Sequence, residues 1–233
     1  MKDKYSKRYK KLIEISNDAK TSKIEDVISK IKKNCTAKFD ESIDISLSLN
    51  LKKKKVEFNI RTIFNLPHGN GKKIRVAVLC EESKIADAKK SGAELYGSET
   101  LINDITAGKI KFDKLISTPG MMSKIGKIGK ILGPKGLMPN PKLGTVTNDI
   151  QSSVKALKSG QIEIKNDKDG NLGASIGKKS FADNKIKENF NLLIEKITKE
   201  KPSGIKGDFI QSAFITSTMG VSYKLMGVSY KLK

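Results

Sequence analysis

The clearest pattern in this chain is a strict alternation of apolar and polar residues from Ile43 to Leu51. Side chains of a β-strand point alternately to its two faces, so the alternation predicts a strand with one buried face. A second alternation runs from Val56 to Thr62, after the lysine run at 52–55. We expect the two strands to pair as antiparallel neighbours, with the lysines at the turn between them.

Helical spacing of apolar residues predicts two helices, one over 22–34 and one around 186–197. Ser22, with Glu25 three residues later, has the pattern of a capping box for the first helix. Alternation returns at Ile162 and Ile164, and a long extended segment is expected over 208–218. The last third of the chain therefore resembles the first third.

The middle of the chain follows a different pattern. Short apolar runs at 74–79 and 115–117 alternate with helical stretches such as 98–107, which predicts βαβ units and a parallel sheet. The turn-rich segment 66–71 marks the change. We therefore expect an α+β domain built from residues 1–67 and 160–233, with an α/β domain inserted at 68–159. Insertion is physically easy, because domain termini often lie close together.

The charge of the chain indicates what kind of partner it binds. Lys and Arg number 46 against 25 Asp and Glu, a formal net charge of +21, so a polyanion is the expected partner. Trp is absent and no lipidation signal is present, which favours a nucleic acid over a membrane. Because nearly all the cations are lysines, we expect recognition of shape and backbone rather than of base edges.

Few residues suit catalysis. His68 is the one histidine and lies in the turn-rich segment, and the glycine-lysine pattern of a nucleoside-triphosphate loop is absent. Cys35 and Cys80 lack metal-ligand spacing and are expected to be reduced thiols. We expect no enzyme activity, cofactor or metal, and an intracellular protein without a membrane span. The alternative is an α/β enzyme whose inserted domain binds a nucleotide or a phosphorylated ligand.

Three segments are candidates for nucleic-acid contact, each with a plain alternative. The loop at 126–144 combines glycines and lysines, as a phosphate-binding loop or a solvated surface loop would. Lys38 and Phe39 suit contact with an RNA backbone and base. In the alternative, Phe39 is a core residue and the Lys38 side chain extends past it to solvent. The hydroxyls and glycine of 216–220 would let RNA backbone approach closely. The seven residues 219–225 are repeated at 226–232.

Together these segments resemble the large-subunit ribosomal protein L1 family, of bacterial type. The resemblance runs from about Tyr9 to Leu225 and keeps its motifs in order. It rests on six segments, of which the third is the most specific: Thr36–Glu41, Leu66–Gly69, Ile131–Lys142, Asn166–Lys168, Ile176–Lys178 and Ser217–Gly220.

The resemblance implies a split RNA-binding domain, a Rossmann-like, three-layer inserted domain and a hinge between them. It also implies a protein of the cytoplasmic 50S subunit that binds 23S rRNA in the mobile stalk, helps release deacylated tRNA from the exit site, and represses its own operon by binding the mRNA. Two features depart from the family: Val221, where many members have Pro, and the second tail copy. The implied RNA-binding residues are Lys38, Phe39, Ser42, Asp167, Lys168, Ser212, Thr218, Met219 and Gly220.

Overall fold

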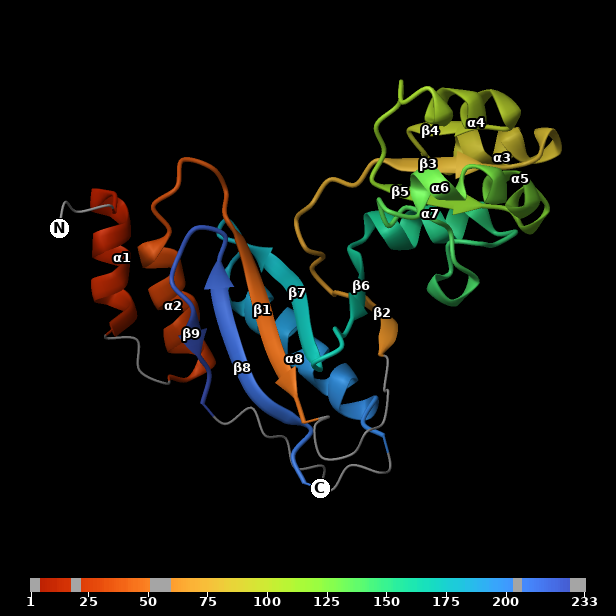
Figure 1. The fold of residues 1–233 in the computed structure, drawn as a ribbon. Helices are drawn as coiled ribbons and strands as arrows, with labels where there is room; N and C mark the ends of the chain where they lie inside the picture. Colours follow the sequence, from red (N-terminus) through yellow and green to blue (C-terminus); the bar gives the residue numbers. More distant parts are fainter. Residues whose placement is uncertain (1–4, 18–21, 51–59, 203–206, 227–233) are drawn as a thin grey trace. The chain divides into compact units, whose positions relative to one another are not determined.

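A computed structural model describes residues 5–17, 22–50, 60–202 and 207–226. The chain divides into two compact units, one formed by Met1–Gly71 with Ile162–Lys233 and the other by Lys72–Gln161 (Figure 1). The chain thus leaves the first unit after Gly71 and re-enters it at Ile162. The first unit is α+β and the second is α/β, which is the fold class expected from the sequence.

The first unit is built on a four-stranded antiparallel sheet in the order β7-β1-β8-β9. The alternation from Ile43 is confirmed as the central strand. The ranges are β1 (Ser42–Leu49), β7 (Asn171–Lys178), β8 (Ile210–Ser217) and β9 (Tyr223–Lys224).

The expected pairing of the first two alternating segments is wrong. β7 and β8 occupy both edges of β1, so no edge is left for the next strand. That strand, β2 (Arg61–Asn65), pairs instead with β6 (Gln161–Lys165). The start of the second alternation, at 56–59, lies outside the described residues.

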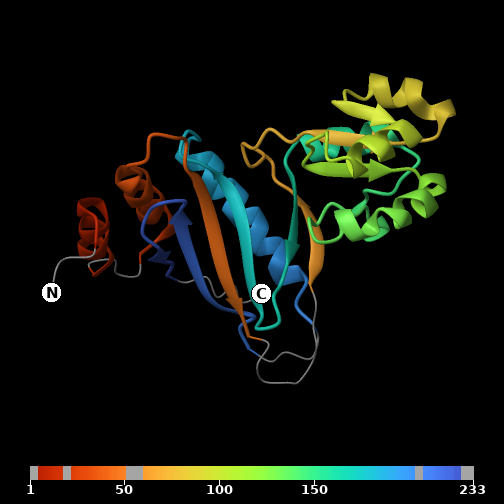
Figure 2. The same cartoon turned by 45° about the horizontal axis from the view of Figure 1, so that its top comes forward.

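Two helices cover one face of the sheet, and a third packs beside them (Figures 1 and 2). They are α2 (Ile24–Asn34), α8 (Asp183–Lys199) and α1 (Lys7–Asn17). The expected capping box is wrong: the residue preceding α2 is Lys23, which makes no side-chain cap. Ser22 is instead held at the sheet edge, where its N–H donates to the Lys224 carbonyl at 3.3 Å. None of the described helices is long and apolar enough to span a membrane.

The opposite face of this sheet carries mainly small polar side chains, with the half-buried Phe214 among them. Within the unit, no described helix lies over it (Figures 1 and 2). Because residues directly opposite in neighbouring strands share a face, three strands contribute to one surface. Its exposed or half-buried members are Ser42, Asp44, Ser46 and Ser48 of β1, Ser212, Phe214 and Thr216 of β8, and Asn171, Gly173 and Ser175 of β7.

The second unit is a three-layer α/β fold around a parallel sheet in the order β4-β3-β5. The strands are β4 (Leu95–Gly97), β3 (Val76–Leu79) and β5 (Lys114–Ser117). One core cluster packs the sheet against α3 (Ile85–Lys90) and α7 (Ile150–Lys158). A second cluster packs the other face against α4 (Glu99–Thr106), α5 (Met122–Lys127) and α6 (Gly129–Leu132).

Candidate nucleic-acid interface

The start of β1 and the end of β8 bring two expected RNA-binding segments together. Ser42 lies opposite Thr218 in the antiparallel ladder, and its backbone N–H donates to the Thr218 hydroxyl at 3.0 Å. The N–H of Thr218 donates in return to the Ser42 carbonyl at 3.1 Å. Residues that are far apart in sequence therefore form one corner of the sheet, which we name the strand-end site (residues 37–42 and 217–220).

A buried carboxylate holds the two halves of the strand-end site in place. Glu41 is fully buried, and its two oxygens accept the backbone N–H of Ala37 at 3.0 Å and that of Met219 at 3.1 Å. Burial acts to raise the pKa of this carboxyl, but the two amides and the nearby Arg8 guanidinium outweigh it, so the pKa lies below its ordinary value. Glu41 lies within a family motif, but sequence reasoning gave it no site role.

Two apolar side chains at the strand-end site face solvent. Phe39 is 54% exposed and Met219 is 49% exposed, so Phe39 is not a core residue. Lys38, beside Phe39, is exposed as well. An exposed aromatic ring with a neighbouring ammonium group offers a stacking surface and a phosphate partner at once.

Gly220 closes the turn after β8 at very close range. A Cβ built at this position would lie 2.2 Å from the hydroxyl oxygen of Ser217, whose side chain is buried. The N–H of Gly220 donates to the Ser217 carbonyl at 3.2 Å. Glycine is therefore favoured at this turn, because a larger residue would require the Ser217 hydroxyl to rotate.

The other expected RNA-binding residues lie at the far end of the same strands. Ser48, near the end of β1, pairs with Ser212 on one side and with Asn171 on the other. Because a strand rises about 3.4 Å per residue, this end is about 20 Å from Ser42. The structure thus places the nine residues in two groups, joined by the small polar side chains of the open sheet face.

The two expected RNA-binding residues in the turn between β6 and β7 have different roles. The Asp167 carboxylate accepts the N–H groups of Asp169 at 3.0 Å and of Asn171 at 2.7 Å. The hydrogen bonds from Asn171 keep the pKa of this exposed carboxyl below its ordinary value. Asp167 is therefore occupied in forming the turn, while Lys168 is exposed at its tip.

The glycine-lysine segment at 126–144 belongs to the second unit, and the expectation that it is a loop throughout is wrong. It contains the end of α5 and all of α6, and the part that follows α6 is well anchored. The Asn140 side chain accepts the N–H of Lys142 at 2.9 Å, and its backbone N–H donates to the Thr145 hydroxyl at 2.8 Å. Leu132 and Leu143 are buried. The part that follows α6 is thus fixed by its own hydrogen bonds and apolar anchors. Lys130 of α6 and Lys135 lie at the surface of the segment.

The histidine and the cysteines have structural surroundings. The His68 ring contacts the Glu188 carboxylate, and its backbone N–H donates to the Asn189 side chain at 3.3 Å. Cys35 and Cys80 are buried free thiols, and burial raises the pKa of each. These contacts fit the structural role expected for His68 and the reduced state expected for both thiols.

Comparison with known proteins decides the family. Residues 31–221 match the model of the ribosomal protein L1p/L10e family. The chain belongs to the ribosomal protein L1 family. The large ribosomal subunit protein uL1 of Pelagibacter ubique is 56% identical over 221 residues, which cover 94% of this chain and 96% of that protein. The proteins of the same name from Fervidobacterium nodosum and Prochlorococcus marinus are 44% and 45% identical, and each match covers 95% of this chain.

The match to the family model includes the residues of the candidate interface and leaves out α1, the start of α2 and β9. All nine expected RNA-binding residues lie between 31 and 221, as does Val221, which is buried. Helix α1 precedes the matched residues. The second tail copy begins with the exposed Met226, and its remaining residues lie outside the described ones.

Proposed function

We propose that this chain is a structural constituent of the large ribosomal subunit in the bacterial cytoplasm, where it binds 23S rRNA directly and forms the mobile stalk. Membership in a family of ribosomal proteins, rather than of enzymes, supports the first part. The net charge of +21 supports a polyanionic partner. The proposal for direct binding rests chiefly on the strand-end site.

The strand-end site combines the chemistry that a folded RNA requires. Lys38 supplies a cation for a phosphate, and Phe39 supplies a ring on which a base or sugar can stack. Thr218 is exposed just past the end of β8. Its hydroxyl oxygen accepts the Ser42 N–H and keeps a second lone pair that can accept a hydrogen bond from a 2′-OH. At the far end of the sheet, Ser212 and Lys168 extend the contact, and Asp167 acts by shaping the turn that presents Lys168.

Two finer roles follow from the family resemblance. We propose that the chain takes part in the release of deacylated tRNA from the exit site, as a component of the stalk. We also propose that it represses its own operon by binding the mRNA with the same sheet face that binds rRNA. A shared surface would make rRNA and mRNA compete, because one site cannot hold both.

A gel-shift titration at fixed salt tests direct binding. The full chain is titrated against the stalk-junction fragment of the 23S rRNA and against a scrambled RNA of equal length. We expect clear preference for the junction, and a loss of about tenfold or more in affinity on Phe39→Ala, since one stacked base contributes about 1–3 kcal/mol. Tyr96→Ala, which removes an exposed ring in the second unit, is the matched control. Equal binding of both RNAs would leave charge alone as the explanation.

A further inference from the structure

A basic pocket lies between α1 and α2 in the first unit, outside the interface described so far. It has a volume of about 420 Å³, which is within the range of about 300–1,000 Å³ typical of ligand sites. Four cationic side chains line it and no acidic side chain does. The lining residues are Lys7, Arg8, Lys11, Leu12, Ile15, Lys33, Asn34 and Thr36.

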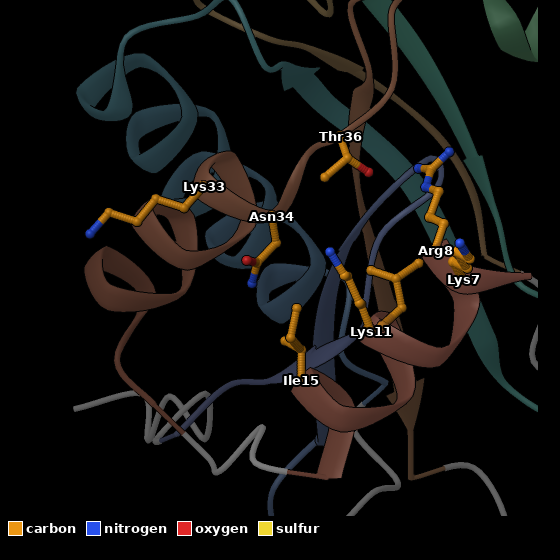
Figure 3. A pocket seen from close by; sticks show the side chains of 8 residues that line it. Lys7, Arg8, Lys11, Ile15, Lys33, Asn34 and Thr36 are labelled. Atoms are coloured by element: carbon orange, nitrogen blue, oxygen red, sulfur yellow. The ribbon is translucent and has the colours of Figure 1, made fainter.

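One ammonium group, that of Lys11, points into this pocket above an apolar floor. Figure 3 shows the Lys11 ammonium pointing toward Asn34 and Thr36, with Ile15 below it and Lys33 directed away. Leu12 and Ile15 pack against the core of the unit, which fixes α1 on that side. An anionic group of a ligand could therefore bind the cations of α1, while a less polar part of the same ligand packs on Leu12 and Ile15.

The charges of α1 are unfavourable for the helix by itself. Lys7 and Lys11 are like charges four residues apart on one face. The first turn contains Lys7 and Arg8 and no acidic residue, although a helix N-terminus favours negative charge. A bound anion would relieve both unfavourable interactions, so anion binding would stabilise α1.

The pocket is continuous with the strand-end site. The Arg8 guanidinium donates through Nη2 to the Met219 carbonyl at 3.3 Å. On the other side Thr36 lines the pocket, two residues before Lys38. An RNA strand lying on Phe39 and Met219 would therefore pass the mouth of the pocket.

We propose that this pocket holds a backbone phosphate of the RNA bound at the strand-end site, with Lys7 and Lys11 as its cations and the adjoining sugar on the apolar floor. The inference rests on the proposed function, because the occupant is part of that RNA. It assigns a ligand role to α1, which precedes the residues matched by the family model. Inorganic phosphate offers the same chemistry and is the competing occupant.

The test compares two double variants of the full chain over a range of salt concentrations. Lys7→Gln/Lys11→Gln removes the pocket cations, and Lys185→Gln/Lys196→Gln removes two exposed cations of α8. We expect the pocket variant to lose about tenfold in affinity for the junction RNA, as for one charge-assisted contact. The slope of log affinity against log salt should fall by about 0.7–0.9, the value of one phosphate. The α8 variant should keep the slope of the unmodified chain.

Acetylation of lysine amines, followed by mass spectrometry, gives a readout that needs no variant. Junction RNA should protect Lys7 and Lys11 and leave Lys185 and Lys196 reactive. Protection by inorganic phosphate and not by RNA would overturn the inference, as would equal effects of the two double variants. Because the preference for junction over scrambled RNA is measured in the same titrations, loss of that preference identifies failure of the proposed function itself.

Discussion

The backbone N–H of Met219 donates to the carboxylate of Glu41 at 3.1 Å, across a sequence separation of 178 residues. The same carboxylate accepts the N–H of Ala37, which lies just before Lys38 and Phe39. Glu41 thus holds both halves of the strand-end site, whose exposed side chains include an ammonium group, an aromatic ring and a hydroxyl group. Its negative charge is offset by the Ala37 and Met219 amides and by the nearby Arg8 guanidinium.

Glu41→Gln should weaken both the fold and RNA binding. A carboxamide has one acceptor oxygen, so one of the two N–H groups would lose its partner, at a cost of about 1–3 kcal/mol in the free energy of unfolding. We expect lower affinity for the junction RNA, because the 218–220 turn is no longer held. Urea unfolding and the gel-shift titration measure the two effects. Glu200→Gln, an exposed carboxyl at the end of α8, should change neither.

The contribution of Glu41 should depend on pH in a defined direction. Its pKa in the folded chain lies below the ordinary value of 4.5, so the folded state favours the carboxylate. The stabilisation is therefore complete above pH 4.5 and is lost as the pH falls through the folded pKa. The difference in unfolding free energy between the unmodified chain and Glu41→Gln should stay constant from pH 7 to about 5 and shrink below that. A difference that grows on acidification would contradict the assignment.

Gly220→Ala should destabilise the strand-end turn by about 1–2 kcal/mol, since the new methyl group would collide with the Ser217 hydroxyl unless that hydroxyl rotates. Rotation would remove the Ser217 hydroxyl from Glu41, whose pKa it helps to lower. The double variant Gly220→Ala/Ser217→Ala should recover part of the loss in thermal unfolding. Gly173→Ala is the control, because a Cβ there meets open space.

Asn189→Leu should cost about 3 kcal/mol or more in the free energy of unfolding. The buried Asn189 amide donates to the carbonyls of Gly69 at 2.9 Å and Ile176 at 2.8 Å, and accepts the His68 N–H. Leucine would leave these three backbone groups without their partner. Denaturant unfolding measures the loss. Asn191→Leu, exposed two residues along α8, should change stability by less than about 0.5 kcal/mol.

Several features of this protein were determined by local sequence. The alternation from Ile43 fixed both β1 and its buried face, because the side-chain period of a strand depends only on neighbouring residues. The change from alternating segments to βαβ spacing identified the inserted parallel sheet for the same reason. Composition alone gave the polyanionic partner.

Other features depended on contacts between distant segments, which no local pattern encodes. Strand pairing placed β7 and β8 beside β1, excluded β2, and separated Ser42 from Ser212 and Lys168. The burial of Glu41 and the pocket beside Lys11 exist only once remote elements pack together. Sequence therefore supplied the candidate residues for RNA contact, and tertiary structure decided which of them lie together, because hydrogen-bonded ladders and buried charges are long-range properties of the fold.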